Sequence, residues 1–254
     1  MKNKVVIVTG GSSGMGKYMA KKFHDEGANV VITGRNEERL DEAKKEISSD
    51  GSNIMSVVMD VRNPEDVERM VQVTDETYGR IDFLVNNAAG NFIVPFEKLT
   101  PNGWKSVIDI VLNGTFNCSS IVGKYWIEKG IKGCITNMVA TYAWNAGAYV
   151  AHSAAAKAGV LSLTRTLAVE WGRKYGIRVN AIAPGPIDRT GGSEKLWESE
   201  EAAKRTIHSV PLQRLGEPEE IAELAYFMFS DKATYLNGEV ITLDGGQWLN
   251  EHPF

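Results

Sequence analysis

The chain of 254 residues is poor in the features that mark several protein classes. It has two cysteines, Cys118 and Cys134, and a formal net charge of −4 with no basic stripe. So few cysteines exclude a disulfide-rich scaffold, and an acidic chain lacks the electrostatic footprint of a nucleic-acid binder. No apolar run approaches the roughly 20 residues of a membrane span. We therefore expect two buried thiols, no metal ion, and neither nucleic acid nor membrane as a partner.

The first residues, MKNKVVIVTGG, also lack the pattern of a signal peptide. Their apolar run is short, ends at glycine and is followed by no cleavage-site pattern. This absence predicts a cytoplasmic protein.

What the chain does have is a series of short apolar runs rich in valine and isoleucine. Each is typical of a strand buried on both faces of a parallel sheet, and charged segments of helical period lie between them. The pattern predicts an α/β fold: a Rossmann-type, doubly wound parallel sheet of seven strands with helices on both faces, as a single domain over residues 1–254. The seven runs are KVVIVTG, NVVITGR, NIMSVVMDV, IDFLVNN, GCITNMVA, IRVNAIAPG and GEVITLDGG.

One long connection interrupts this regular alternation. Residues 184–218 are polar and punctuated by glycine, and they lie between the last two predicted strands. A long connection in a compact domain often covers a site. We expect a substrate lid around residues 186–215.

A glycine-rich segment follows the first predicted strand. Gly10, Gly14 and Gly16 stand at the start of the next helix, where glycines permit a tight turn and a close approach of backbone N–H groups to a pyrophosphate. The spacing differs from the general G-x-G-x-x-G fingerprint, and alone it could be a simple strand–helix turn. Its place after the first of seven strands favours a cofactor site. The predicted contacts of this loop are Gly10, Ser12, Ser13, Gly14, Met15 and Gly16.

The second strand ends in ITGRN, where NAD enzymes usually carry an acid for the ribose 2′-hydroxyl. An acid would repel a 2′-phosphate, whereas an arginine can bind it through two hydrogen bonds. Arg35 could also be a solvated surface residue. The missing acid and the present arginine together predict NADPH rather than NADH.

Several further segments occur in the order typical of one family: TGGSSGMG at 9–16, Asp60 in MDV, NNAAG at 86–90, Asn113, Lys157 and PGPI at 184–187. Together they resemble the short-chain dehydrogenase/reductase family over essentially the whole chain. The resemblance implies that Asp60 contacts the adenine and that Lys157 binds the nicotinamide ribose. It also implies that Asn113 holds a water linked to that lysine. The other cofactor contacts it implies are Val61, Asn87, Ala88, Ala89, Pro184, Gly185 and Ile187.

The pattern breaks at the acid. The family usually has Tyr-x-x-x-Lys with a serine upstream, but here Ser153 takes the tyrosine position and Ala140 the serine position. The glycine of the NNAG segment is replaced by Ala89. A serine hydroxyl is a far weaker acid than a phenol, whose pKa is about 10. Ser153 therefore cannot simply replace the tyrosine.

Three nearby side chains could supply the proton instead. Tyr149 lies eight residues before Lys157. If helical, it is roughly 12 Å away along the axis, too far to share one site. His152 lies outside the face that carries Lys157 and is more typical of a surface or packing residue. Tyr142 follows the fifth strand, beside the crevice where such sheets bind ligands. Packing in the core or against a lid is an equal alternative for Tyr142.

A closer resemblance favours the tyrosine. The segments NNAAGNF (86–92), IVLNGTF (110–116), ATYAW and APGPI, with the serine at 153, resemble 2,4-dienoyl-CoA reductases. The resemblance implies that Tyr142 is the proton donor and that Asn91 binds the thioester oxygen. Ser153 and Lys157 then serve the ribose. Peroxisomal relatives use an aspartate on the fifth helix, so Asp109 is the alternative donor.

The chemistry of a dienoyl thioester explains why the acid would move. Hydride goes to C5, negative charge spreads toward the distant thioester oxygen, and the proton is delivered to C2 to give a 3-enoyl product. The acid must therefore lie further along the substrate than in a ketone reductase. The expected function is NADPH-dependent reduction of 2,4-dienoyl-CoA in the degradation of unsaturated fatty acids. A carbonyl reductase with an atypical acid and a non-catalytic NADP-binding sensor are the alternatives.

The resemblance also implies a homotetramer. The family assembles through its fifth and sixth helices and through the last strand region. Here the helices would include residues 102–130 and 154–172, both apolar on more than one face.

Overall fold

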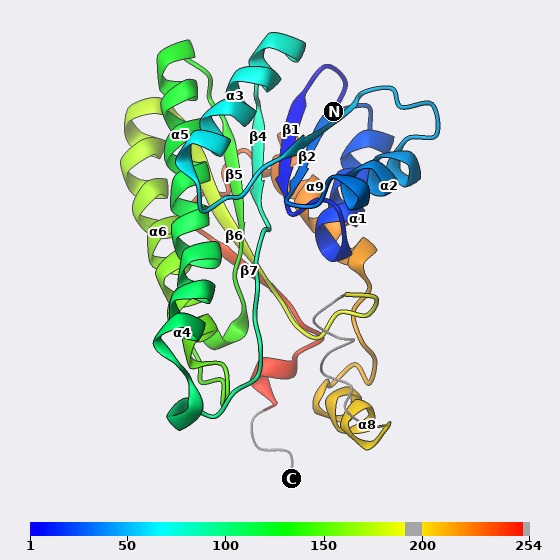
Figure 1. Ribbon diagram of the computed structural model, residues 1–254, viewed down its shortest axis with the longest axis vertical. Helices are drawn as coiled ribbons and strands as arrows, with labels where there is room; N and C mark the ends of the chain where they lie inside the picture. Colours follow the sequence, from blue (N-terminus) through cyan, green and yellow to red (C-terminus); the bar gives the residue numbers. More distant parts are fainter. Residues whose placement is uncertain (191–199, 251–254) are drawn as a thin grey trace.

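The structure is a computed structural model that describes residues 1–190 and 200–250. Its centre is a parallel sheet of seven strands in the order β3-β2-β1-β4-β5-β6-β7 (Figure 1). The strands are β1 (Val5–Thr9), β2 (Asn29–Gly34), β3 (Ile54–Val58), β4 (Phe83–Asn86), β5 (Cys134–Met138), β6 (Arg178–Pro184) and β7 (Val240–Leu243). Each strand falls within one of the seven predicted runs, so the predicted fold class is confirmed.

Two layers of helices cover the sheet, one on each face. The helices α3 (Pro64–Tyr78), α4 (Pro101–Ile108), α5 (Gly114–Lys129) and α6 (Ala151–Tyr175) lie on one side in Figure 1. The helices α1 (Gly14–Asp25), α2 (Glu37–Ile47) and α9 (Pro218–Phe229) lie on the other. A further helix, α8 (Glu200–Ser209), stands apart from both layers, beyond the end of β6.

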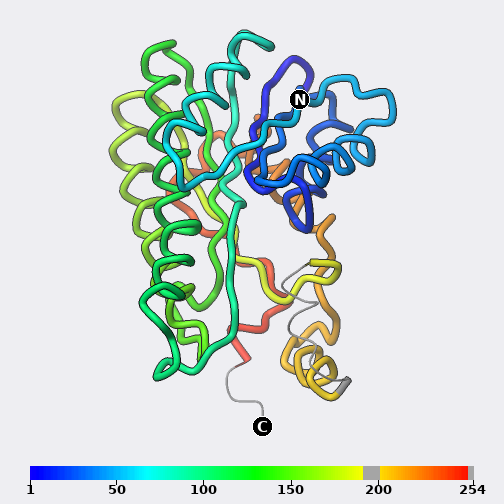
Figure 2. Tube along the Cα trace, in the orientation of Figure 1, coloured from blue at the N-terminus to red at the C-terminus, as the bar shows by residue number. Residues whose placement is uncertain are grey.

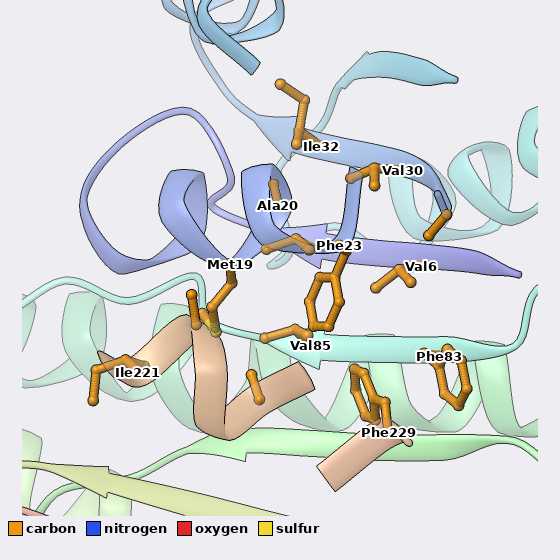
Figure 3. Packing of buried hydrophobic residues seen from close by; sticks show 14 of the residues in the cluster. Val6, Met19, Ala20, Phe23, Val30, Ile32, Phe83, Val85, Ile221 and Phe229 are labelled. Atoms are coloured by element: carbon orange, nitrogen blue, oxygen red, sulfur yellow. The ribbon is translucent and has the colours of Figure 1, made fainter. Parts of the chain in front are cut away.

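The apolar runs are continuous because each strand has a core on both faces. On β1, Val6 and Val8 pack with α1, α2 and α9, whereas Val5 and Ile7 pack with α3 and α5. All four side chains are fully buried. On the first face, the ring of Phe229 stacks on Phe83 at 4.6 Å between centroids (Figure 3). Burial on alternate faces of one strand is the reason why the run shows no polar alternation.

Three helix starts, those of α2, α3 and α4, are capped by the side chain of the N-cap residue. Asn36 accepts a hydrogen bond from the backbone N–H of Arg39 at 2.8 Å, and Thr100 accepts one from Gly103 at 3.1 Å. Such caps satisfy N–H groups that have no partner within the helix. The side chain of Ser13, the N-cap of α1, makes no capping hydrogen bond with the described residues. The first turn of α1 therefore keeps its N–H groups for another acceptor.

Three local features of the chain bear on the site. The helix that carries Lys157 begins at Ala151, because Tyr149 has a left-handed φ of 64° and cannot continue a helix there. The connection 184–218 contains α8. Between α4 and α5 the chain winds as a π-helical segment, Asp109–Asn113, of the kind often found at functional sites.

The segments that follow β4, β5 and β6 all leave the sheet at the same end of the strands, and α8 lies at this end too (Figure 2). This end is the carboxyl end of a parallel sheet. The strand order reverses between β1 and β4, and ligands bind at such a switch point. Cys118 and Cys134 are buried, unpaired thiols, as expected.

Candidate active site

The glycine loop after β1 is built for close approach. Gly10 and Gly14 have φ angles of 64° and 50°, which side chains disfavour. A Cβ on Gly16 would lie 2.4 Å from the carbonyl oxygen of Gly10, so only glycine fits there. With the uncapped start of α1 beside it, this loop fits the pyrophosphate of a dinucleotide.

Asn87 ties this loop to the end of β4. Its side-chain NH2 group donates to the carbonyl oxygens of Thr9 and Gly10 at 3.0 and 3.2 Å. The hydroxyl of Thr9 accepts from the backbone N–H groups of Asn87 and Ala88, both at 3.0 Å. The predicted contacts at 87–89 and in the glycine loop are thus brought together, with Ala89 exposed beside them.

Buried side-chain amides link β4, β5 and α6. Asn86 donates to Asn137 on β5 at 2.8 Å, and Asn137 donates to Thr164 on α6 at 2.9 Å. Buried polar groups joined in this way fix the relative position of β4, β5 and α6. The loops after β4 and β5 therefore start from a rigid base.

The adenine end of the predicted site carries more positive charge than the sequence analysis recognised. The guanidinium of Arg62 binds the carboxylate of Asp60, with 2.9 Å from Nε to Oδ1. This hydrogen bond, and more weakly the charge of the exposed Arg35, lowers the pKa of Asp60. Arg62 was missed, although a basic residue two positions after the aspartate was a signal for it. Val61, which lies between Asp60 and Arg62 in the sequence, is buried against the backbone of Gly114.

The predicted catalytic lysine lies inside the protein. Lys157 is 8% exposed, and its Nζ donates to the carbonyl oxygen of Met138 at 2.5 Å. Burial lowers the pKa of Lys157 to about 8. An ammonium group with so little water around it gains a great deal from hydroxyl or carbonyl acceptors of a ligand.

Tyr142 and Ser153 meet one turn before that lysine. The two hydroxyl oxygens are 3.1 Å apart and form a hydrogen bond. Burial raises the pKa of Tyr142, and the hydrogen bond with Ser153 opposes this shift only in part. The phenol is therefore protonated at neutral pH, which is the state a proton donor needs.

The other candidate donor is in the opposite state. Asp109 forms an ion pair with Lys105 at 2.5 Å and accepts a hydrogen bond from Asn113 at 2.9 Å. The hydrogen bond with Lys105 is the main reason why the pKa of Asp109 is lowered. Asp109 is a carboxylate here, and it holds the amide of Asn113 within the π-helical segment.

Asn91 lies on the segment after β4 and is exposed. Its side-chain oxygen accepts from the backbone N–H of Phe92 at 2.9 Å. An amide whose oxygen is held in this way presents its NH2 group as the donor for a ligand oxygen.

The end of β6 forms the last wall. A Cβ on Gly185 would lie 2.6 Å from Asp244, so the chain after Pro184 packs directly on the chain after β7. Ile187 is buried and pairs with Gly216 as an isolated bridge. The predicted contacts at 184–187 therefore lie on a firmly held segment.

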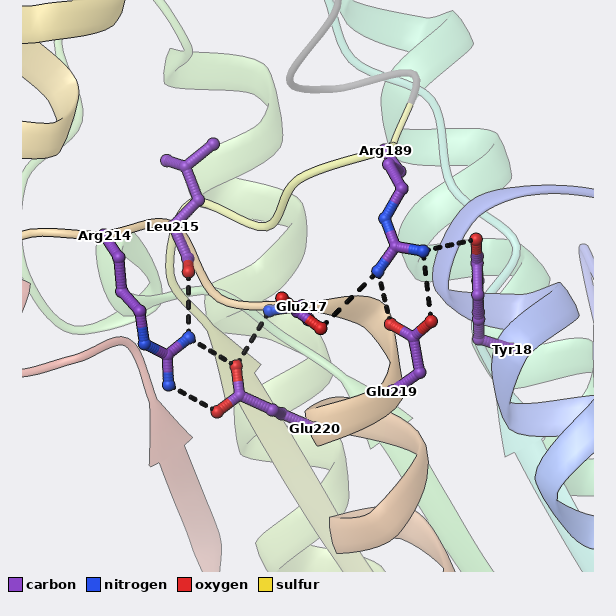
Figure 4. Close-up of polar contacts among 7 residues, drawn as sticks. All are labelled: Tyr18, Arg189, Arg214, Leu215, Glu217, Glu219 and Glu220. Carbon is purple, nitrogen blue, oxygen red and sulfur yellow. Dashed lines mark hydrogen bonds and ion pairs between the residues drawn. The ribbon is translucent and has the colours of Figure 1, made fainter.

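Two arginines hold the described ends of the long connection. Arg189 binds Glu219, with 2.6 Å between Nη2 and Oε2, and Arg214 binds Glu220 at 2.6 Å (Figure 4). Both carboxylates belong to the first turn of α9. Residues 191–199 of the predicted lid lie outside the described residues.

Residues 10–247 match the family model described as enoyl-(acyl carrier protein) reductase. The crystal structure of a short-chain dehydrogenase from Bacillus anthracis is 65% identical, with a TM-score of 0.92 over 99% of both chains. The chain belongs to the short-chain dehydrogenase/reductase family. It is an oxidoreductase of a family that uses nicotinamide cofactors, as the sequence predicted.

The curated relatives narrow the family. A Bacillus subtilis protein named probable 2,4-dienoyl-CoA reductase, (2E)-enoyl-CoA-producing, is 64% identical over the full length of both chains. A Danio rerio protein named peroxisomal 2,4-dienoyl-CoA reductase, (3E)-enoyl-CoA-producing, is 40% identical over 98% of this chain and 83% of its own length. The predicted resemblance to 2,4-dienoyl-CoA reductases is confirmed. Among the described residues of this reductase, no helix combines the length and apolar character that crossing a bilayer requires.

Proposed function

We propose that the protein reduces 2,4-dienoyl-CoA thioesters with NADPH. The observation that carries the proposal is the position of the Tyr142 hydroxyl, 3.1 Å from the Ser153 oxygen and held in its protonated form by burial. Ser153 occupies the position of the usual acid, and the phenol reaches it from the segment after β5. The names of both relatives support the substrate class.

The residues that would hold the cofactor follow from the geometry. The glycine loop and the start of α1 fit the pyrophosphate, and the buried Nζ of Lys157 fits the ribose hydroxyls. Arg35 and Arg62 supply positive charge for a 2′-phosphate beside Asp60. NADPH, when bound, supplies the hydride that reduces C5 of the diene.

The protein supplies the proton and the electrostatic support. The Asn91 amide donates to the thioester oxygen, where negative charge collects, and Tyr142 delivers its proton to C2. Ser153 donates to the phenolic oxygen as this proton leaves. Protonation at C2 leaves the double bond between C3 and C4, which is the 3-enoyl product.

Around the site, segment 186–215 acts as a lid. Its described ends are tied to the first turn of α9 by Arg189 and Arg214, which anchors them to the body of the protein. A lid excludes water from a reactive enolate. We place this enzyme in the cytoplasm, where reducing conditions preserve the two buried thiols.

The deciding experiment is reduction of a 2,4-dienoyl-CoA by NADPH in deuterium oxide, with the product analysed by NMR and mass spectrometry. We expect turnover and deuterium on C2. Deuterium on C4 and a 2-enoyl product would match the name of the Bacillus subtilis relative and contradict proton delivery to C2. Reduction of ketones alone would show a carbonyl reductase, and tight NADPH binding without any turnover would show a sensor.

A further inference from the structure

His152 is the least explained buried group near the site. Its side chain is fully buried in the first turn of α6, next to Ser153. Neither ring nitrogen has a hydrogen-bond partner among the described residues. A buried polar atom without a partner destabilises the folded state, and a native protein that keeps one usually has a reason.

The histidine lies beneath the segment that carries Asn91. The ring of Phe92, the next residue, meets the His152 ring edge-on, with 4.4 Å between centroids. The backbone N–H of Val94 donates to the carbonyl oxygen of Tyr149 at 3.0 Å, which ties the same segment to the residues before α6. His152 therefore supports the segment of the proposed thioester donor.

Packing alone does not account for a histidine here. Phe92 also packs on α4, where a Cβ on Gly103 would lie 3.0 Å from the Phe92 ring. A phenylalanine at 152 would keep an aromatic contact with Phe92 and bury no unpaired nitrogen. The two unpaired ring nitrogens of His152 thus lower the stability of the free protein, and a residue with a purely structural role would not carry them.

We propose that His152 is a positioning residue of the acyl-thioester site, which donates a ring N–H to an oxygen of the loaded site and holds Phe92 and Asn91 in register with the thioester. The oxygen belongs to a single water bound with the thioester, so His152 acts on the substrate through that water and through Phe92. This inference rests on the proposed reductase function. It is distinct from proton donation, which belongs to Tyr142.

The test compares His152→Phe with His152→Asn and His152→Gln in the full-length protein. For His152→Phe we expect thermal unfolding a few degrees higher, because an unpaired polar group is removed. We expect kcat/KM for a 2,4-dienoyl-CoA to fall about tenfold or more, with NADPH affinity unchanged. The Asn and Gln variants place an amide near Nδ1 and Nε2 respectively, and one of them should recover activity.

Thr136→Val is the matched control. The buried Thr136 hydroxyl also has no hydrogen-bond partner within residues 1–190 and 200–250, but it lies within β5. This variant should gain stability and keep wild-type kinetics.

If His152→Phe unfolds at a lower temperature than the wild type and keeps wild-type kcat/KM, the histidine is a packing residue and the inference is wrong. If the variant is too unstable to assay, Phe92→Leu tests the same contact and should raise KM. Wild-type protein that reduces no dienoyl thioester would overturn the proposed function, and this inference with it.

Discussion

At the scale of single residues, the surroundings of each acid decide its role. Tyr142 and Asp109 both lie near the site, but burial keeps the first protonated and an ion pair with Lys105 keeps the second ionised. A group that has already lost its proton cannot donate one. This difference favours Tyr142 as the proposed donor, and it could not be read from residue types.

We predict that Tyr142→Phe lowers kcat on a dienoyl-CoA by about 10²–10⁴-fold, because a positioned acid typically contributes that much. NADPH affinity should stay unchanged, since the phenol serves the substrate. Stopped-flow turnover and fluorescence titration of NADPH measure the two effects. Ser153→Ala should reduce kcat much less. If Tyr142→Phe keeps full activity and Asp109→Asn is inactive, the proton donor is Asp109 and not Tyr142.

Cofactor preference is tested at Arg35. Arg35→Ala should weaken NADPH by roughly ten- to a hundredfold and leave NADH nearly unchanged, because hydrogen bonds to charged groups contribute about 1.5–3 kcal/mol. Dissociation constants for both cofactors give the answer. Since Arg62 adds charge at the same end, the double variant with Arg62→Ala should weaken NADPH further. Equal losses for the two cofactors would refute the assignment.

The buried Lys157 predicts a pH effect on stability. Its pKa is about 8 in the folded protein and 10.5 in the unfolded chain, so the unfolded state binds more protons between these values. The free energy of unfolding should therefore rise by about 3 kcal/mol from pH 8 to pH 10.5, relative to Lys157→Met. Urea unfolding of both cofactor-free proteins across this range measures the difference. Parallel pH profiles would show that Lys157 is not desolvated.

At the scale of elements, the site is an assembly of strand ends. The glycine loop follows β1, Asn87 follows β4, Tyr142 follows β5 and Gly185 follows β6. Parallel strands bring all of these to one edge, although they are far apart in the chain. Hydrogen bonds restrain the loop at Asn87, and close backbone contacts restrain the chain at Gly16 and Gly185.

The glycine loop gives the sharpest test of an element. Gly16→Ala would place a Cβ 2.4 Å from the Gly10 oxygen and 2.5 Å from the Asn87 amide nitrogen. We expect NADPH affinity to fall at least tenfold and stability to fall by about 1–3 kcal/mol, as for other overpacked sites. Calorimetric titration and thermal unfolding measure both. Ser13→Ala, whose native side chain makes no capping hydrogen bond, should leave stability unchanged.

At the scale of the whole molecule, we propose a homotetramer. The outer faces of α5 and α6 expose apolar side chains: Phe116 is 55% exposed and Val169 is 76% exposed. We expect light scattering at micromolar concentration to give four times the mass of one chain. Val169→Glu should yield smaller species, whereas Val58→Glu, on the edge strand β3, should not. A monomeric wild-type protein would contradict the proposal.

The fold was predictable because its signals are local. Seven valine- and isoleucine-rich runs identified seven strands, since strands buried on both faces need continuous apolar sequence. The glycine loop was equally clear from spacing. The start of α6 could not be predicted in the same way, because nothing local in the sequence marks the left-handed φ of Tyr149 that ends the loop before the helix.

The sequence by itself determined the strand count, the parallel topology, the cofactor loop and the absence of tyrosine at position 153. These depend on residue type and spacing along a few turns of chain. Only the tertiary structure decided that Tyr142 meets Ser153, that Asp109 is ionised, and that the buried His152 ring has no hydrogen-bond partner in the described part of the chain. The physical reason is that pKa values and hydrogen-bond satisfaction depend on burial and on neighbours from other elements, which sequence spacing does not specify.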